Sequence, residues 1–438
     1  MSGYDLAQHV NQYLQDTGHP VRTIAKISQN PERSKHLETA TTSVLGLLVD
    51  FVNLRSEIYN SDSRIPQISY GTPSEDAFRR DITINALFYN IHTKQVEDFT
   101  ARGLDDLRAG IVRTPLEPFK TFTDDPLRVL RVLRFASRFG YEIEQSTSEA
   151  IGRPEIKDDL DAKISRERVG AELEKMVEGP NPLLAIQMIL QYGLYDNIFR
   201  APGMEEKQYM VGKDAAVTEQ LTRNILQLLG QTDSAALVNR IPEGFSVLSD
   251  SQARRALILS AYLYPFHGMQ TPNGKRLLAQ VVIRDGLKLS NQDIDAVTAL
   301  HTLAPVFSQG AKDCQNDQAT RTSLGLQIRQ AGKRWPAAVV FAAAVEMLHQ
   351  PSAQETSNVG NRYAGYADRI LAENLQEAYL LKHLVDGKVA ASVLGIRPGP
   401  AIKGVLEQIM EWQLGNPKGT QEQCKEYIVQ VISPTLAK

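Results

Sequence analysis

Cysteine, long apolar runs and an excess of charge of either sign are all scarce in this sequence. Its two cysteines, Cys314 and Cys424, lie far apart and outside any CxxC pattern or histidine cluster, which excludes a disulfide-based scaffold and a structural zinc site. No run of about eighteen or more apolar residues occurs, so we predict a soluble protein in a reducing compartment. The net charge of -3 excludes a protein that is basic all over, although a local basic face could still hold RNA phosphates.

The pattern of apolar residues indicates two kinds of structure along the chain. The 438 residues are 42% hydrophobic and 23% charged, which favours several packed domains over disorder. Residues 43–55, 83–89 and 95–98 are rich in β-branched and other apolar side chains, and we predict strands of a small mixed sheet there. From Pro126 onward the apolar residues follow a helical period. Loop signals divide the helical part at residues 178–182, 351–361 and 397–400. The predicted fold class is α+β followed by all-α.

The most informative segment is a predicted helix that opens at residue 123. It starts with two carboxylates, Asp124 and Asp125, and continues with arginines at positions 128, 131, 134 and 138 on the side opposite its apolar residues. One interpretation is structural, with Asp125 as the N-cap, Pro126 at the first helical position and the arginines on a solvated face. The other is functional, because a carboxylate can accept the amino hydrogen of cytosine or adenine while an arginine donates to the adjacent ring nitrogen. Uracil and guanine present the reverse pattern.

Three further motifs accompany residues 119–141. Residues 79–87 read RRDITINAL, residues 98–113 combine Asp-Phe with a later glycine and acidic residues, and residues 164–180 run from ISRER to EGP. In this order and spacing the four segments resemble the RRDxTxNAL, flexible-link, nucleotide-selecting and neck-closing motifs of the class II CCA-adding tRNA nucleotidyltransferase and poly(A) polymerase family. Residues 384–413 are similar to the tail of the eukaryotic enzymes.

The resemblance implies roles for the arginines and the acidic pair. Arg80 would contact the nucleotide phosphates, and Asp125 with Arg128 would read the base edge. The pair's other member, Asp124, is counted with the nucleotide-binding residues. Arginine suits these roles because its forked donors match phosphate oxygens, and phosphoryl transfer depends mainly on positioning and charge neutralisation. For Arg80 the structural alternative is an exposed charge.

Four more residues are assigned to the nucleotide by the same resemblance. Arg131 and Arg134 would help to hold it. Asp81 and Asn85 are candidates for a ribose contact, but hydrogen bonding at a turn or strand edge is an equally good interpretation of both.

Asp50 lies in an otherwise apolar stretch, where an unpaired carboxylate would be costly to bury. The resemblance implies that Asp50 is a catalytic, metal-binding residue, the third acid beside two metal-binding aspartates. The alternatives are an ion pair with Arg55 or a position at the edge of the sheet.

The sequence departs from the family at its start. The family begins with a GGxVRD turn and a strand whose DxD pair holds two Mg²⁺ ions, whereas residues 1–7 here resemble the stretch after that strand. Two-metal catalysis needs several carboxylates, so we expect Met1 to be an internal methionine and the chain as numbered to be inactive. It would be either a fragment of an active enzyme or a shortened, non-catalytic RNA-binding paralogue.

The resemblance implies an organisation and a reaction. We expect a truncated nucleotidyltransferase head (1–118), a helical neck (119–182), a helical body (183–350) and a helical, tRNA-contacting tail (351–438). The intact protein would use Mg²⁺, CTP and ATP to add C and A to the 3′ end of tRNA. Addition of C only, of A only or of poly(A) stays open. The expected compartments are mitochondria, nucleus or cytosol, with no membrane partner, and the sequence does not indicate an oligomeric state.

Overall fold

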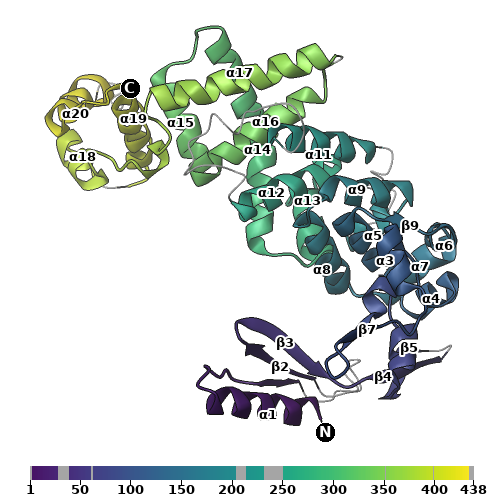
Figure 1. Cartoon of the computed structure of the whole chain (residues 1–438). Helices are drawn as coiled ribbons and strands as arrows, with labels where there is room; N and C mark the ends of the chain where they lie inside the picture. The colour runs from purple at the N-terminus through teal and green to yellow at the C-terminus, as the bar shows by residue number, and fades with distance from the viewer. Residues whose placement is uncertain are drawn as a thin grey trace. The chain divides into compact units, whose positions relative to one another are not determined.

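A computed structural model describes most of the chain, namely residues 2–27, 39–60, 63–203, 214–230, 250–350, 352–397 and 399–433. The chain forms two compact units, Met1–Ile198 and Phe199–Lys438. Among the described residues, small strands are confined to the first unit apart from one isolated bridge, and helices make up most of both units (Figure 1). This confirms the predicted α+β class with a long helical part. Within the described residues no helix is long and apolar enough to cross a membrane.

The first unit opens with small antiparallel sheets. Helix α1 (Gly3–Asp16) begins at a capping box in which Ser2 and Asp5 satisfy each other's backbone N–H groups. It lies along a three-stranded sheet, as Figure 1 shows. The strands of this part are β1 (Ala25–Ile27), β2 (Thr39–Val44), β3 (Leu47–Val52), β4 (Arg55–Asn60), β5 (Ser63–Tyr70), β6 (Phe88–Asn90) and β7 (Gln95–Glu97). They form separate sheets, with the order β1-β2-β3 in the largest and two hairpins, β4-β5 and β6-β7.

Two of the predicted strands are corrected by the structure. Residues 43–55 are not one strand, because Leu45 and Gly46 adopt positive φ angles of 50° and 85° and form the turn between β2 and β3. Residues 83–89 contain a 3₁₀ turn, Thr83–Ala86, before β6 begins. The predicted strand at residues 95–98 is confirmed by β7.

The remainder of the first unit is helical. Its helices are α2 (Pro73–Phe78), α3 (Gly103–Ala109), α4 (Pro118–Asp124), α5 (Leu127–Phe139), α6 (Gln145–Ile151), α7 (Pro154–Lys163), α8 (Arg166–Val177), α9 (Pro182–Gln191) and α10 (Tyr195–Ile198). The parallel pair β8 (Ile111–Val112) and β9 (Glu142–Ile143) joins the segments on either side of α4 and α5. Helix α5 packs on α8 and α9, and its Val129, Val132 and Leu133 are fully buried.

The predicted helix that opens at residue 123 is wrong at its start. Thr123 and Asp124 end α4, and Asp125 is extended, with φ −143° and ψ 97°. The cause is Pro126, whose ring disfavours the helical conformation in the preceding residue. The chain therefore breaks at Asp125 and restarts as α5.

The second unit is helical throughout its described residues, apart from the isolated Gln270–Leu277 bridge. Its α-helices are α11 (Ala216–Leu228), α12 (Ser251–Tyr262), α13 (Leu278–Val281), α14 (Asn291–Gln315), α15 (Arg321–Ala331), α16 (Trp335–Met347), α17 (Ala353–Ala372), α18 (Gly387–Leu394), α19 (Ala401–Gly415) and α20 (Gln421–Tyr427). Helix α16 is buried along nearly its whole length. The last three helices enclose a separate small core around Val385, Ile409 and Ile428.

Of the three loops predicted in the helical part, two are confirmed and one is wrong. The loop at residues 178–182 is confirmed between α8 and α9, and the break near residues 397–400 is confirmed in the described residues between α18 and α19. The loop expected at 351–361 is wrong, because Ser352 caps α17 and the helix runs through this stretch. The division into head, neck, body and tail stays a prediction.

Candidate functional site

A cavity of about 640 Å³ in the first unit brings together segments that are far apart in the sequence. This volume is in the range of small-molecule sites. Six arginines and four carboxylates are part of its lining, which gives it a net positive charge. The lining residues are Arg55, Glu57, Ile68, Arg79, Arg80, Asp81, Asn85, Asp124, Asp125, Pro126, Leu127, Arg128, Arg131, Ile164, Ser165 and Arg168. Seven of the eight residues predicted to bind the nucleotide are among them, and Arg134 is not.

Asp125 projects from the break between α4 and α5 that Pro126 creates. Its Oδ1 accepts a hydrogen bond from the N–H of Leu127 at 3.2 Å, and its Oδ2 pairs with Nη2 of Arg168 at 3.0 Å. These contacts bear out part of the capping interpretation, although Pro126 occupies the N-cap position. An ionised carboxylate has about four acceptor sites, so Asp125 can accept a further hydrogen bond from a ligand in the cavity.

Arg128 is held by a different set of partners, and its side chain is almost fully buried. Its Nη2 donates to the carbonyl oxygen of Arg79 at 2.7 Å and lies 3.8 Å from Oε2 of Glu57. Arg128 is therefore not on a solvated face, and the structural interpretation of the arginine stripe is wrong at this position. Asp125 and Arg128 line one cavity, where Arg168 contacts Asp125, and Arg79 and Glu57 contact Arg128.

Arg79 and Arg80 share one buried carboxylate on α2. Asp76 is 2% exposed, and its Oδ1 accepts from Nε of Arg79 at 2.7 Å while its Oδ2 accepts from Nη2 of Arg80 at 2.9 Å. Burial would raise the pKa of Asp76, but the hydrogen bonds and charges of these two arginines outweigh it and the pKa lies below its usual value. Arg80 also lies over the ring of Phe88, 4.8 Å from its centroid. Arg80 is thus a fixed cation in the cavity lining.

Asp81 and Asn85 form one hydrogen-bonded unit with Arg131. Asp81 Oδ1 accepts from Asn85 Nδ2 at 2.9 Å, and its Oδ2 pairs with Nη2 of Arg131 at 2.7 Å. Asp81 is 4% exposed. Both interpretations of Asp81 and Asn85 find support, since the two residues make local turn contacts and also face the cavity.

Arg134 lies apart from the other predicted residues. Its Nε donates to Oε2 of Glu172 at 2.6 Å, and both side chains are buried. Glu172 also lies 3.8 Å from Arg131 and 3.1 Å from Lys175. The buried carboxylate of Glu172 thus links Arg131, which lines the cavity, to Arg134, which faces another surface.

Asp124 is the last residue of α4, and its carboxyl group is half-buried. Burial raises its pKa, and the charge of Arg128 partly opposes that shift. The two acids of the pair therefore differ. The carboxylate of Asp125 has an arginine partner, whereas the surroundings of Asp124 are less favourable for a negative charge.

Asp50 lies outside this lining and is exposed on β3. Its Oδ1 accepts a hydrogen bond from the hydroxyl of Thr41 at 2.6 Å, across the β2-β3 pair. The sheet-edge alternative is confirmed, because β3 is the last strand of its sheet, while Arg55 pairs with Glu57 at 3.3 Å. The described residues contain no group of three or more Asp, Glu, His or Cys side chains that could hold a metal ion.

The sequence-based site omitted three residues that organise the cavity. Arg168 holds Asp125, Glu57 contacts Arg55, Arg79 and Arg128, and Asp76 anchors two arginines. Arg168 lies within the ISRER segment and Glu57 shortly after Asp50, so a signal existed for both. No feature of the sequence indicated Asp76, because an acidic residue just after the Thr-Pro start of a helix is common in the first helical turn for structural reasons alone.

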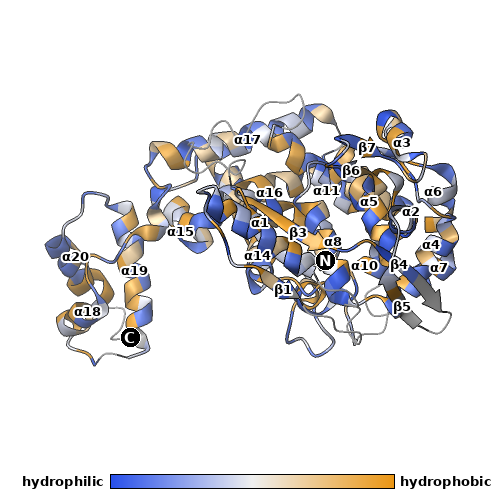
Figure 2. Cartoon of the chain, turned by 60° about the horizontal axis from the view of Figure 1, so that its bottom comes forward, coloured by the Kyte–Doolittle hydropathy of each residue, from blue (hydrophilic) through white to orange (hydrophobic). Residues whose placement is uncertain are grey.

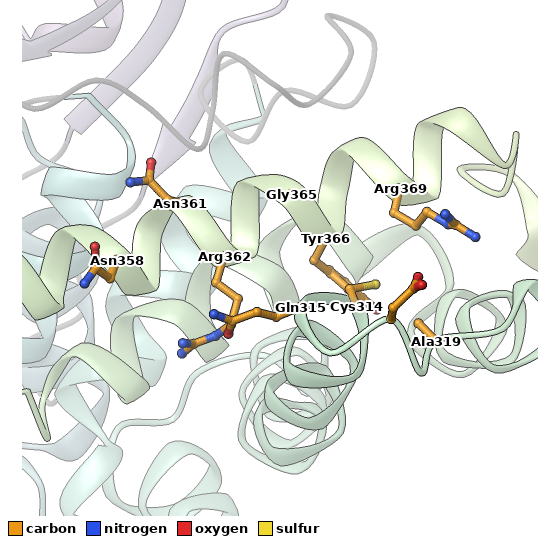
Figure 3. A pocket seen from close by; sticks show the side chains of 10 residues that line it. Cys314, Gln315, Ala319, Asn358, Asn361, Arg362, Gly365, Tyr366 and Arg369 are labelled. Carbon is orange, nitrogen blue, oxygen red and sulfur yellow. The ribbon is translucent and has the colours of Figure 1, made fainter.

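The second unit has its own cavity, of about 540 Å³, between the end of α14 and one face of α17. Figure 3 shows Arg362 and Tyr366 of α17 beside Gln315 and Cys314, with Asn358 and Arg369 further along the helix on either side. Arg362 pairs with Glu346, and Arg369 pairs with Glu373 of the next helical turn at 3.0 Å. Its polar groups therefore come from two neighbouring helices.

The first cavity offers the contacts that a nucleotide needs. Its arginines are fixed by buried carboxylates and can neutralise phosphate oxygens. At the other side Asp125 supplies an acceptor and Arg128 a donor, the combination that matches the edge of cytosine or adenine.

Two family models match parts of the first unit and the start of the second. The family model described as "Poly A polymerase head domain" matches residues 2–113. The family model described as "Probable RNA and SrmB-binding site of polymerase A" matches residues 140–207.

Curated relatives match nearly the whole chain. The mitochondrial CCA tRNA nucleotidyltransferase of Saccharomyces cerevisiae is 37% identical over 99% of this chain and 83% of its own length. The tRNA nucleotidyltransferase cca2 of Schizosaccharomyces pombe is 33% identical over 98% of this chain and 86% of its own length. Among solved structures, the Bacillus stearothermophilus CCA-adding enzyme in complex with CTP has the same fold, with a TM-score of 0.61, 18% identity and coverage of 100% of this chain and 99% of that one.

Proposed function

The chain belongs to the family of CCA tRNA nucleotidyltransferases, and from this premise we propose that it binds CTP and ATP in the cavity of the first unit for addition of C and A to the 3′ end of tRNA. The observation that carries the proposal is the meeting of Asp125 and Arg128 in a cavity lined by fixed arginines. In this proposal Asp125 accepts the exocyclic amino hydrogen and Arg128 donates to the ring nitrogen. UTP and GTP would place a carbonyl against the carboxylate and are disfavoured.

The other cavity residues would hold the remainder of the nucleotide. Arg80 and Arg131 contact phosphate oxygens in this proposal, and Asp81 and Asn85, which belong to the same lining, contact the ribose. In the reaction the terminal 3′ oxygen of the tRNA bonds to the α-phosphorus of the nucleotide. The bond between the α-phosphorus and the oxygen that bridges it to the β-phosphorus breaks, so pyrophosphate leaves, and the proton of the 3′ hydroxyl is released. The fixed arginines stabilise charge on the phosphates without having to reorganise.

The predicted Mg²⁺ site is not formed by the described residues. Asp50 is one exposed carboxylate with a hydroxyl donor, and no cluster of further ligands accompanies it. Its roles as catalytic and metal-binding residue stay predictions. We also propose that residues 1–438 by themselves bind nucleotide and tRNA but do not transfer nucleotides, because two-metal catalysis needs more carboxylates than the described residues bring together.

Two measurements separate the parts of this proposal. The first is equilibrium binding of CTP, ATP, UTP and GTP to the whole chain, with tighter binding of CTP and ATP expected. The second is incorporation of labelled CTP or ATP into tRNA that lacks its terminal CCA. Equal binding of all four nucleotides would refute base selection, and robust incorporation by residues 1–438 would refute the proposed inactivity.

Alternative activities within the family can be told apart by the product. C-only, A-only and poly(A) addition would each give a different 3′ end in a form of the protein that transfers nucleotides. A non-catalytic RNA-binding paralogue would bind tRNA without nucleotide preference. Genomic sequence upstream of codon 1 provides a further test, since an in-frame GGxVRD and DxD would favour the enzyme and a stop codon with neither would favour the binder.

We propose that the tail contributes to tRNA retention and not to nucleotide choice. Helices α18, α19 and α20 enclose their own core, and their segment has no acid–arginine pair like that of Asp125 and Arg128. Deletion of residues 377–438 should weaken tRNA binding and leave the preference for CTP and ATP unchanged. A deleted protein with full tRNA affinity would contradict this role. As for location, the Saccharomyces cerevisiae relative is described as mitochondrial, and mitochondria, nucleus and cytosol all stay candidate compartments.

A further inference from the structure

A second groove in the first unit lies at the C-terminal end of α5. It has a volume of about 380 Å³ and is lined by Arg134, Arg138, Phe139, Lys175 and the 178–180 loop. Arg134, which the sequence assigned to the nucleotide, thus faces this groove and not the cavity that contains Asp125. The selection of nucleotides by Asp125 and Arg128 therefore does not explain this groove.

Phe139 lines the groove and belongs to a row of aromatic rings along α5 and just after it. Phe135 and Phe139 are stacked, with centroids 6.1 Å apart and an interplanar angle of 13°. Tyr141 continues the row, 5.5 Å from Phe139. Phe139 is 48% exposed, although burial would be expected of a phenylalanine with only a structural role. The exposed ring is therefore a candidate platform for another planar group.

Cations accompany these rings. Arg134 lies over Phe135 at 4.1 Å and Arg138 lies 6.0 Å from the centroid of Phe139. Lys175 is half exposed and shares the buried Glu172 with Arg134, whereas no described carboxylate forms an ion pair with Arg138. Three cations and one carboxylate, Glu178, line the groove. Exposed aromatic rings interleaved with cations are the usual elements of a surface that binds single-stranded nucleic acid.

We propose that this groove holds the unpaired 3′ end of the RNA substrate, with a base stacked on Phe139 and phosphates near Arg138 and Lys175. The inference rests on the proposed function, because it names the part of the RNA that would lie beside the nucleotide cavity. An unpaired base offers its face to an aromatic ring, whereas the bases inside an RNA duplex are already stacked on one another. The groove accordingly selects single-stranded over double-stranded RNA.

The spacing along α5 fits a strand that leads to the nucleotide. Arg131 lines the cavity and Arg138 lines the groove, and at 1.5 Å per residue they are about 10 Å apart along the helix axis. That span equals roughly three bases at the stacking distance of about 3.4 Å. Phe135 lies between them, with Arg131 5.8 Å from its centroid. The aromatic row thus runs from the groove toward the cavity.

The test uses the whole chain and two RNAs with the same acceptor stem, one with an unpaired 3′ strand and one blunt. Binding is measured by fluorescence anisotropy at fixed salt, since phosphate contacts depend on salt. Phe139→Ala should weaken binding of the RNA with the unpaired strand by about 5- to 150-fold, the effect of losing one stacked base. Binding of the blunt RNA should not change, and Phe139→Trp should restore the affinity.

Three controls make the result specific. Tyr89→Ala removes an aromatic ring that is 61% exposed on β6, outside the groove, and should change neither affinity. Phe139→Leu keeps an apolar side chain without an aromatic face and should behave like Phe139→Ala. Arg138→Ala should weaken binding of the RNA with the unpaired strand more than Arg108→Ala, which removes an exposed arginine elsewhere in the first unit.

The outcomes distinguish this inference from the proposed function. Unchanged binding by Phe139→Ala, an equal loss for both RNAs, or full affinity in Phe139→Leu would overturn the stacking role, even if the wild type binds CTP and ATP selectively. Failure of the wild type to prefer CTP and ATP would instead count against the proposed nucleotide selection and leave the RNA comparison to decide on the groove.

Discussion

The two cavities of this protein contain similar residues but differ in how they are built. In the first unit, Arg128 contacts Arg79 and Arg131 contacts Asp81, 49 and 50 residues away in the sequence, and the Asp81 carboxylate is buried. In the second unit, Arg369 pairs with Glu373 four residues further along α17, and the Glu373 side chain is 27% exposed. The first arrangement requires the tertiary fold, while the second cavity combines one tertiary pair, Arg362 with Glu346 of α16, and the helical i,i+4 pair of Arg369.

This difference indicates which cavity has been shaped for a ligand. Several cations held close together by buried carboxylates cost desolvation energy, and such sites are common where a charged ligand binds. Surface pairs on a helix contribute little and are frequent without function. We therefore expect substitutions around the first cavity to have larger effects on both stability and binding.

The largest expected effect follows from removal of a buried carboxylate. Glu172→Ala would leave Arg134 buried without its partner, which typically costs about 3–5 kcal/mol. Glu373→Ala, the matched change in the second unit, should cost about 1 kcal/mol or less. Hydrogen–deuterium exchange of α5 and α17 measures the two local effects. Similar protection losses in both helices would remove the distinction between the two cavities.

A smaller effect is expected on nucleotide affinity. Arg128→Lys keeps a charge but loses the planar fork that donates to the Arg79 carbonyl, and CTP binding should weaken by about 10- to 100-fold. Arg369→Lys should leave CTP affinity unchanged. Calorimetric titration of both variants, with melting temperatures as the control, tests this difference. If CTP affinity fell as much in Arg369→Lys as in Arg128→Lys, the result would contradict the assignment of the nucleotide to the first cavity.

The smallest effect concerns acid stability of the second unit. Burial holds the pKa of His301 at about 4, below 6.5 in the unfolded chain, so the folded state binds the proton less readily. The stability that neutral His301 supports is complete above about pH 6.5 and is lost as the pH falls toward 4. At pH 5 the loss is about 2 kcal/mol.

In the first unit, the comparable group is Glu144. Burial raises the pKa of Glu144, but hydrogen bonds from Ser146 and Thr147 outweigh burial and hold this pKa at about 2, against 4.5 in the unfolded chain. The stability that ionised Glu144 contributes is therefore lost only below about pH 4.5.

Both tryptophans, Trp335 and Trp412, belong to the second unit, so their fluorescence follows its unfolding alone. Stability measured this way should fall between pH 6.5 and 4.5, and His301→Gln should reduce the slope. An unchanged slope in His301→Gln would mean that other groups, such as the neighbouring His267, control acid unfolding.

The sequence predicted the helical part better than the strands. The apolar period after Pro126 and the glycine–proline signals at residues 178–182 were sufficient for α5, α8 and α9. The hairpin at Leu45 and Gly46 was missed because apolar residues continue through the turn, and Figure 2 shows β3 mostly in the orange of hydrophobic residues. The start of α17 was missed because Ser352 provides an N-cap in a stretch that otherwise looks like a loop.

The limits of the site prediction have one physical cause. Periodicity places arginines on a helix face, but it does not reveal that Arg128 and Arg134 are buried or which carboxylates hold them. Arg134 was assigned to the nucleotide with Arg131, yet a shift of three residues along α5 turns it toward another groove. Asp125 was recognised as important, but its partner Arg168 lies 43 residues away and could be identified only from the fold.

The most direct test of nucleotide selection is the ratio of affinities for CTP over UTP and ATP over GTP, measured for wild type and Asp125→Ala with melting temperatures alongside. If Asp125 reads the base edge, the wild type prefers CTP and ATP, and Asp125→Ala loses about 5- to 150-fold of that preference. A lowered melting temperature with unaltered ratios would show that Asp125 only stabilises the start of α5 and its ion pair with Arg168, and would contradict the assignment of this cavity to base selection.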